Sequence, residues 1–232
     1  MKTIAIILAS GVGARLGLSI PKQFFQIKGK SVLERSIIAF HNHENIDEII
    51  IVSHPDYIND VENIIKKGAY QKVSKVISGG KTRQESSYNG ISAIIEKDAN
   101  VLIHDGVRPF VSKRIIDECI STLDEYKAVN VAIESSDTII EIDEENCIKN
   151  IPQRKFLRRV QTPQGFNLNT IKEAHKLASS CKNLSFTDDC GLIQEFKLAK
   201  IKVIEGDENN IKITYPSDIK IAENIIDVCD KI

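Results

Sequence analysis

Cysteine is sparse in this sequence, with five residues among 232, and no two of them are spaced as C-x-x-C. An odd number of cysteines at irregular spacing supports neither a disulfide framework nor a zinc site. The sequence also lacks any apolar stretch near the roughly 20 residues that a membrane-spanning helix needs, and it begins with a strand pattern that carries one lysine. We therefore expect a cytoplasmic protein that is neither secreted nor inserted in a membrane.

A surplus of charge of either sign is absent as well. The 31 Lys and Arg residues nearly balance the 32 Asp and Glu residues, and the two signs are interspersed. This balance indicates neither a nucleic-acid-binding surface nor an acidic tail. The length suits a single domain with a full hydrophobic core, so we expect residues 1–232 to form one domain.

Strands and helices alternate through residue 134. Capping boxes at Ser31–Glu34 and Thr82–Glu85 predict two of the helix starts. Short apolar, β-branched runs predict buried strands at residues 3–9, 49–53, 73–77, 101–104 and 129–133. Such alternation indicates an α/β protein with a Rossmann-like, mostly parallel sheet and helices on both faces.

The alternation ends after residue 134. Residues 135–163 contain short apolar pieces around the acidic turn Asp143–Asn146, which predicts a protruding hairpin arm. A two-stranded arm is marginally stable alone. We expect it to embrace a second subunit in a homodimer; the alternative is a hairpin folded onto its own domain. After the arm, Pro216 opens the last predicted helix.

The first predicted strand ends in a glycine loop. Gly11 and Gly13 allow a sharp turn and expose bare N–H groups, and Arg15 and Lys22 follow. Amides and fixed cations together suit a multiply charged phosphate ester. Leu16 stands where a dinucleotide fingerprint needs its third glycine, and no Walker loop is present. The alternative is an ordinary strand-to-helix turn with solvated cations.

Two further charged or glycine-containing loops follow predicted strands, at Gly79–Arg83 and Asp105–Pro109. Ligands of parallel α/β sheets bind beyond the carboxyl ends of the strands. We therefore expect the three loops to form one ligand site at that edge.

Together these motifs resemble those of the cytidylyltransferases that activate polyol phosphates with CTP, in particular those acting on 2-C-methyl-D-erythritol 4-phosphate and D-ribitol 5-phosphate. The resemblance covers nearly the whole chain and rests on these ordered segments: Gly11–Lys22 with Gln23, Gly79-Gly80 with Arg83 and Ser86, His104-Asp105 with Arg108-Pro109, Asp137-Thr138, Arg154, Gln161–Gln164, Thr187–Asp189 and Asn210–Thr214. It implies a nucleotidyltransferase fold, transfer of CMP from CTP to a polyol phosphate, Mg²⁺ as cofactor and a homodimer.

The chemistry of such a transfer restricts the residues that it needs. A phosphate monoester oxygen attacks the α-phosphorus of CTP in line and expels pyrophosphate, and this nucleophile is already an anion near neutral pH. The reaction therefore requires charge neutralisation and alignment of two anions rather than a general base. The resemblance implies that Arg15 and Lys22 stabilise the transition state and that Lys212 holds the reacting phosphates.

The resemblance also implies two sets of binding residues. The nucleotide-binding set is Ala9, Ser10, Gly11, Gly13, Gly80, Lys81, Arg83, Ser86 and Asp105. The acceptor-binding set is Asp105, Arg108, Thr138 and Arg154, the last two supplied by the other subunit. Gln161–Gln164 is expected to be scaffold.

Three roles stay open at this point. Asp105 could ligate Mg²⁺, bind ribose or contact the acceptor, with Mg²⁺ expected mainly on the triphosphate oxygens. Arg108 could instead pair with Asp105. Arg83 could support its loop or lie in solvent at a helix start.

The acceptor signals conflict. Gly79–Ser86 and Thr187–Asp189 look more like the methylerythritol enzymes, whereas Ile151–Arg154 resembles the enzymes of wall and capsule pathways. The Asp105-Gly-Val-Arg108 loop departs from the Asp-Ala-Ala-Arg common in methylerythritol enzymes. We expect 2-C-methyl-D-erythritol 4-phosphate, with D-ribitol 5-phosphate as the alternative. A non-catalytic nucleotide-binding homologue is the alternative of another class, and the presence of Arg15, Lys22 and Lys212 argues against it.

Overall fold

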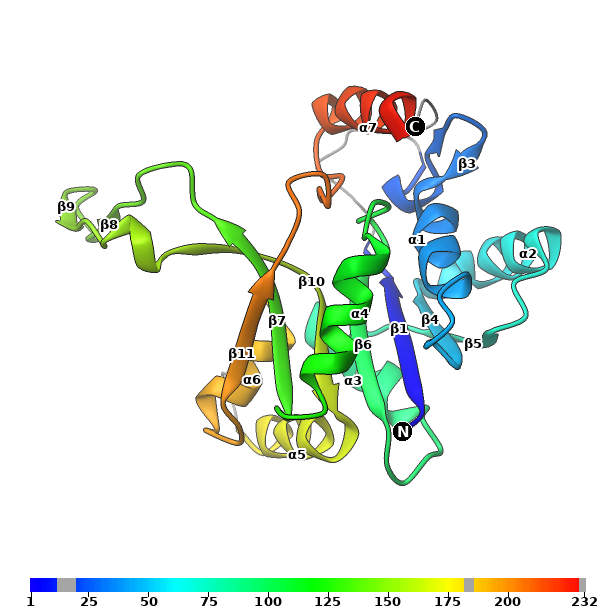
Figure 1. The fold of residues 1–232 in the computed structure, drawn as a ribbon, viewed down its shortest axis with the longest axis horizontal. Coiled ribbons are helices and arrows are strands. Elements are labelled where there is room, and N and C mark those ends of the chain that lie inside the picture. The colour runs from blue at the N-terminus through cyan, green and yellow to red at the C-terminus, as the bar shows by residue number, and fades with distance from the viewer. Residues whose placement is uncertain (12–19, 182–185, 230–232) are drawn as a thin grey trace.

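The computed structural model describes residues 1–11, 20–181 and 186–229. Its centre is a seven-stranded sheet with the order β11-β7-β10-β6-β1-β4-β5 (Figure 1). The strands are β1 Thr3–Ala9, β4 Glu48–Ser53, β5 Val73–Ser78, β6 Asn100–Asp105, β7 Ala128–Glu134, β10 Arg158–Asn167 and β11 Ile201–Glu205. Neighbouring strands are parallel except where β10 pairs, antiparallel, with β6 and β7. The predicted, mostly parallel α/β sheet is confirmed.

Helices cover both faces of the sheet. They are α1 Val32–His41, α2 Ile58–Gly68, α3 Arg83–Ser92, α4 Lys113–Thr122, α5 Leu168–Ser179 and α6 Asp189–Glu195; a further helix, α7 Pro216–Cys229, packs against loops instead. One buried apolar cluster joins α3, α5 and α6 to the sheet, and a second joins α1, α2 and α4 to it. Within the described residues, no helix is both long enough and apolar enough to span a membrane.

The central strand β1 explains why both faces must be covered. Its side chains alternate between the two clusters, with Ile4, Ile6 and Leu8 in one and Ala5, Ile7 and Ala9 in the other. A strand buried on both faces reads as a continuous apolar run, which is the pattern that predicted it.

The helix starts follow the predicted caps. Ser31 Oγ accepts a hydrogen bond from Glu34 N at 3.1 Å, and Thr82 Oγ1 accepts one from Glu85 N at 3.1 Å. The second cap fixes the start of α3 directly after the Gly79–Gly80 turn. It thereby places Arg83 at the carboxyl edge of the sheet.

The last helix lies against the loops at this edge. In a third apolar cluster, Ala222 and Ile226 of α7 pack with Val107, Ile213 and Ile27. Ile27 belongs to a small hairpin, β2 Gln26–Ile27 and β3 Lys30–Ser31. The cluster brings the segment around Ile213 beside the loop that follows β6.

The predicted arm range of 135–163 is too long. From Arg158 the chain forms β10, which enters the sheet between β7 and β6, and its residues 161–166 are buried. Polar side chains and Pro163 hide this strand from pattern analysis. The proline lies where the pairing with β7 shifts register, between Val160 and Gln164, a position at which a strand tolerates proline.

The arm projects away from the sheet and helices (Figure 1). It contains the short hairpin β8 Glu141–Ile142 and β9 Ile148–Asn150, followed by a 3₁₀ turn at Arg154–Phe156. Its apolar side chains are not packed: Phe156 is 75% exposed and Ile148 60% exposed. The alternative of a hairpin folded onto its own domain is therefore wrong.

Candidate active site

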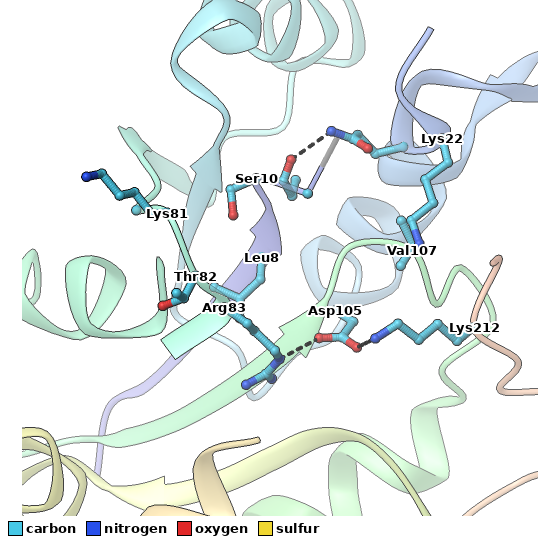
Figure 2. Close-up of a pocket in the computed structure, with 13 residues that line it drawn as sticks. Leu8, Ser10, Lys22, Lys81, Thr82, Arg83, Asp105, Val107 and Lys212 are labelled. Carbon is cyan, nitrogen blue, oxygen red and sulfur yellow. Dashed lines mark hydrogen bonds and ion pairs between the residues drawn. The ribbon is translucent and has the colours of Figure 1, made fainter. Parts of the chain in front are cut away.

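The three predicted loops meet at the carboxyl edge of β1 and β6. They line a cavity of about 300 Å³ (Figure 2). The lining residues are Leu8, Ala9, Ser10, Gly11, Lys22, Gln23, Gly80, Lys81, Thr82, Arg83, Asp105, Val107 and Lys212. Four of these are basic and one is acidic, so the cavity suits a polyanion.

The first loop leaves β1 at Ala9 and returns at the 3₁₀ turn Lys22–Phe24. Gln23, to which the sequence assigns no separate role, is buried and donates from Nε2 to Ala9 O at 2.9 Å. This bond ties the two ends of the loop together, and Lys22 beside it is only 9% exposed. Gly13 and Arg15, whose roles the sequence analysis predicts, lie outside the residues that the structure describes.

The second loop is held against the first by Ser86. Ser86 Oγ accepts from Gly80 N at 3.1 Å, donates to Thr82 O at 2.8 Å and lies 2.8 Å from Ser10 Oγ. The residue is fully buried behind the cavity wall. Its hydroxyl group therefore sets the distance between the loops.

Glycine is required where these loops touch. A Cβ on Gly79 would lie 2.5 Å from Ser10 Cβ, and a Cβ on Gly80 would lie 2.3 Å from Glu85 Cβ. Glu85 also accepts from Lys81 N at 2.6 Å, which bends the loop back onto α3. Figure 2 shows the Lys81 side chain extending away from Asp105.

Asp105, at the end of β6, forms two ion pairs. Arg83 Nε lies 3.2 Å from Oδ1 and Lys212 Nζ lies 2.7 Å from Oδ2, approaching from opposite sides (Figure 2). Burial would raise the pKa of Asp105, but these two cations outweigh it and hold the pKa well below its usual range. Asp105 is thus ionised, and both of its oxygens accept hydrogen bonds from cations. The interpretation of Arg83 as a solvated arginine is wrong.

Arg108 does not take the role of pairing with Asp105. Its Nη1 donates to Asn210 O at 2.7 Å and its Nη2 to Val160 O at 3.4 Å. Ile213 N donates to Val107 O at 2.9 Å. Because these bonds hold the backbone on both sides of Lys212, its side chain reaches Asp105 from a fixed position.

The hydrogen bonds of the motif Gln161–Gln164 are of the kind expected of a scaffold, since they join segments that are distant in the chain. Thr162 Oγ1 accepts from Asp105 N at 3.1 Å, and Gln161 Nε2 donates to Asp207 O at 2.8 Å. Gln164 Nε2 donates to Asp188 Oδ2 at 2.9 Å. β10 thereby connects the loop after β6 to the segments that carry Lys212 and Asp188.

The predicted acceptor residues divide into two places. Asp105 and Arg108 line a second hollow of about 180 Å³ beside the main cavity, together with Lys212 and Thr187. Thr138 lies on the exposed arm, and Arg154 lines a different hollow at the base of the arm, where its Nη1 donates to Ser136 O at 3.1 Å. One chain therefore does not bring the acceptor set together.

A basic cavity between glycine loops, at the carboxyl edge of a mostly parallel sheet, is suited to bind the phosphates of a nucleotide. The sequence profile of the 2-C-methyl-D-erythritol 4-phosphate cytidylyltransferase family matches residues 3–228, and the chain belongs to this family. It is thus a CTP-dependent nucleotidyltransferase.

Individual relatives agree with this assignment. The chain is 38% identical to the 2-C-methyl-D-erythritol 4-phosphate cytidylyltransferase of Thermobifida fusca, over 97% of this chain and 93% of that protein. It is 42% identical to a bifunctional ribulose 5-phosphate reductase/CDP-ribitol pyrophosphorylase of Haemophilus influenzae, of which it spans 48% while 97% of this chain is covered. The structure of 4-diphosphocytidyl-2C-methyl-D-erythritol synthase from Anaerococcus prevotii superposes with a TM-score of 0.87 at 32% identity, covering 97% of this chain and 96% of that one.

Proposed function

We propose that this cytidylyltransferase transfers CMP from CTP to 2-C-methyl-D-erythritol 4-phosphate. The family profile and the Thermobifida fusca relative support this acceptor. The single structural observation that carries the transfer itself is the convergence of Lys22 and Lys212, from segments far apart in the chain, on one cavity beside Asp105. Because CTP and the phosphorylated acceptor are intracellular metabolites, we propose a cytoplasmic location.

In this proposal the triphosphate lies along the first loop, among the backbone amides from Ala9 to Gly11. An acceptor phosphate oxygen attacks the α-phosphorus, and the bond from the α-phosphorus to the oxygen bridging the β-phosphorus breaks. Lys22 and Arg15 neutralise the charge that develops, and Lys212 aligns the two phosphates. The acceptor phosphate is ionised near neutral pH, so no proton transfer is required.

Mg²⁺ is the proposed cofactor, carried mainly by the triphosphate oxygens. Among the described residues no group of three His, Cys, Asp or Glu is placed to hold a metal ion, and Asp105 is the carboxylate in the cavity lining. Mg²⁺ keeps several waters and is bound largely through substrate phosphates, so an ion carried by the triphosphate needs few protein ligands here. The ion would supply charge neutralisation on the leaving pyrophosphate.

We propose further that the arm forms a homodimer and completes the acceptor site. Asp105 and Arg108 line one side of the acceptor hollow, whereas Arg154 lies with Lys155 and Arg158 at the base of the arm. In a dimer Thr138 and Arg154 would reach the hollow of the other subunit and bind the acceptor phosphate. The exposed apolar side chains of the arm support such an interface.

A second acceptor, D-ribitol 5-phosphate, is favoured by one specific observation. The Haemophilus influenzae relative is a CDP-ribitol pyrophosphorylase and is 42% identical over 97% of this chain. The alternative would place the chain beside a reductase activity that supplies the polyol phosphate.

The acceptor is tested by the kcat/KM of pyrophosphate release with CTP, Mg²⁺ and each polyol phosphate in turn. We expect kcat/KM to be at least about tenfold higher with 2-C-methyl-D-erythritol 4-phosphate, which corresponds to about 1.4 kcal/mol of transition-state discrimination. A higher value with D-ribitol 5-phosphate would assign the alternative. Absence of turnover with both would reject the transfer.

A further inference from the structure

Four charged side chains of alternating sign run from the cavity into the interior. Lys212 pairs with Asp105, Asp105 with Arg83, and Arg83 with Asp189, whose side chain is 1% exposed. We propose that Asp189 is a positioning residue for the transfer of CMP, an inference that rests on the function proposed above. It holds Arg83 against Asp105, and Asp105 in turn holds Lys212 at the reacting phosphates.

Asp189 is itself fixed from several sides. It is the first residue of α6, and its backbone N donates to Gln164 Oε1 at 3.0 Å. Its Oδ1 accepts from Ser87 Oγ at 2.5 Å and lies 3.4 Å from His175 Nε2. These partners are buried, so the carboxylate is a rigid anchor behind the cavity.

Arg83 is divided between the two carboxylates. Its Nε faces Asp105 at 3.2 Å and its Nη1 faces Asp189 at 2.7 Å. Burial would lower the pKa of Arg83, but Asp189, and after it Asp105, raise the pKa above its ordinary value. A guanidinium held in this way does not swing toward a phosphate. Arg83 therefore acts through Asp105 and not as a ligand of the triphosphate.

Removing the charge of Asp189 has a defined consequence for the cavity. A guanidinium prefers a two-pronged contact with one carboxylate. In Asp189→Asn, the contact with Nη1 loses its charge and weakens, so Arg83 turns more fully onto Asp105 and competes with Lys212 for it. The net charge of the cluster also becomes more positive by one, which does not weaken the binding of a triphosphate.

The first test therefore measures whether Asp189→Asn changes kcat or the KM for CTP. For Asp189→Asn we expect kcat to fall about 10- to 100-fold through misplacement of Lys212, with the KM for CTP unchanged or lower. Glu195→Gln is the matched control, because it removes an exposed carboxylate from the same helix. It should keep both constants at the wild-type values. A KM for CTP that rises as much as kcat falls would overturn the proposal.

A double-mutant cycle with Arg83→Gln supplies the second test. If Asp189 acts only through Arg83, then Arg83→Gln and the double variant Arg83→Gln/Asp189→Asn have the same kcat within about twofold. The double variant leaves neither Arg83 nor Asp189 as an unpaired charge, so this comparison still decides the question if Asp189→Asn alone fails to fold. A double variant tenfold slower than Arg83→Gln would show that Asp189 acts independently.

Failure of the proposed function can be told apart from failure of the proposed role of Asp189. Both tests use ratios to the wild-type protein with whichever polyol phosphate it turns over. Wild-type protein without turnover contradicts the transfer, whereas active wild-type protein with additive variants contradicts only the role of Asp189.

Discussion

At Asp105, burial and charge act in opposite directions on one carboxyl group. The two cations beside it prevail and hold its pKa well below the usual range, so the carboxyl group is ionised near neutral pH. An ionised carboxylate between an arginine and a lysine is suited to hold the lysine in place. It is not suited to donate a proton, which agrees with a reaction that needs no general acid.

The lysine and arginine of the first loop carry the largest predicted effect at the residue scale. Lys22→Ala and Arg15→Ala should each lower kcat by about 10²- to 10³-fold, the usual cost of removing one group that stabilises transition-state charge. Steady-state pyrophosphate release measures the effect, and the thermal midpoint checks the fold. Lys67→Ala, on the exposed end of α2, is the charge-matched control. Near-normal turnover of Lys22→Ala would remove it from the mechanism.

Gly79 gives a steric prediction at the same scale. In Gly79→Ala the new Cβ meets Ser10 Cβ at 2.5 Å, so the two loops must separate and we expect the KM for CTP to rise about tenfold. Ser10→Gly removes that contact, and the combination Ser10→Gly/Gly79→Ala should recover most of the affinity for CTP in calorimetry. If the double variant binds CTP no better than Gly79→Ala, the contact with Ser10 is not the cause.

At the scale of elements, the arm carries apolar side chains that its own subunit leaves exposed. Its apolar side chains Ile142, Ile148, Ile151 and Phe156 are each more than half exposed. A solvent-exposed two-stranded hairpin of this length gains little stability by itself. An interface with a second copy would bury these side chains.

The proposed interface predicts a specific loss on substitution. Phe156→Asp or Ile148→Asp should shift the protein toward monomer in analytical ultracentrifugation and raise the KM for the acceptor more than the KM for CTP. Ile95→Asp is the control, since Ile95 is 83% exposed but lies far from the arm in sequence. A wild-type protein that sediments as a monomer at micromolar concentration would contradict the dimer.

Several elements could be predicted from the sequence because their signals are local. Apolar runs gave β1, β4 and β6, and the caps at Ser31 and Thr82 gave α1 and α3. β10 escaped prediction because Gln161, Thr162 and Gln164 are buried polar residues that form hydrogen bonds with segments distant in the chain. For the same reason the sequence did not reveal that Arg83 lies between Asp105 and Asp189, since the three residues are joined only by the fold.

At the scale of the whole molecule, His104 links acidity to global stability. It is fully buried, with Nε2 2.9 Å from Arg108 O and Nδ1 3.1 Å from Thr162 Oγ1. Burial lowers its pKa from 6.5 to about 4, so the folded protein holds the neutral imidazole. Its contribution to stability is complete above pH 6.5 and is lost as the pH falls toward 4, about 3 kcal/mol in all.

Urea unfolding at a series of pH values measures this dependence. We expect the free energy of unfolding of the wild-type protein to fall between pH 6.5 and 4, and that of His104→Gln to fall less steeply over the same range. His54→Gln, at a partly exposed histidine, is the control for the substitution itself. Equal slopes for wild-type protein and His104→Gln would contradict the buried neutral imidazole.

The central claim is that the polyol phosphate attacks the α-phosphorus of CTP in the cavity formed by the three loops. Phosphorus NMR of a reaction with CTP, Mg²⁺ and 2-C-methyl-D-erythritol 4-phosphate observes the new bond directly. Pyrophosphate and a pair of coupled diphosphate-diester resonances should grow equally, and Lys22→Ala should slow the growth of both by about 10²- to 10³-fold. Release of CMP without the coupled pair, or no change in the CTP resonances, would contradict it.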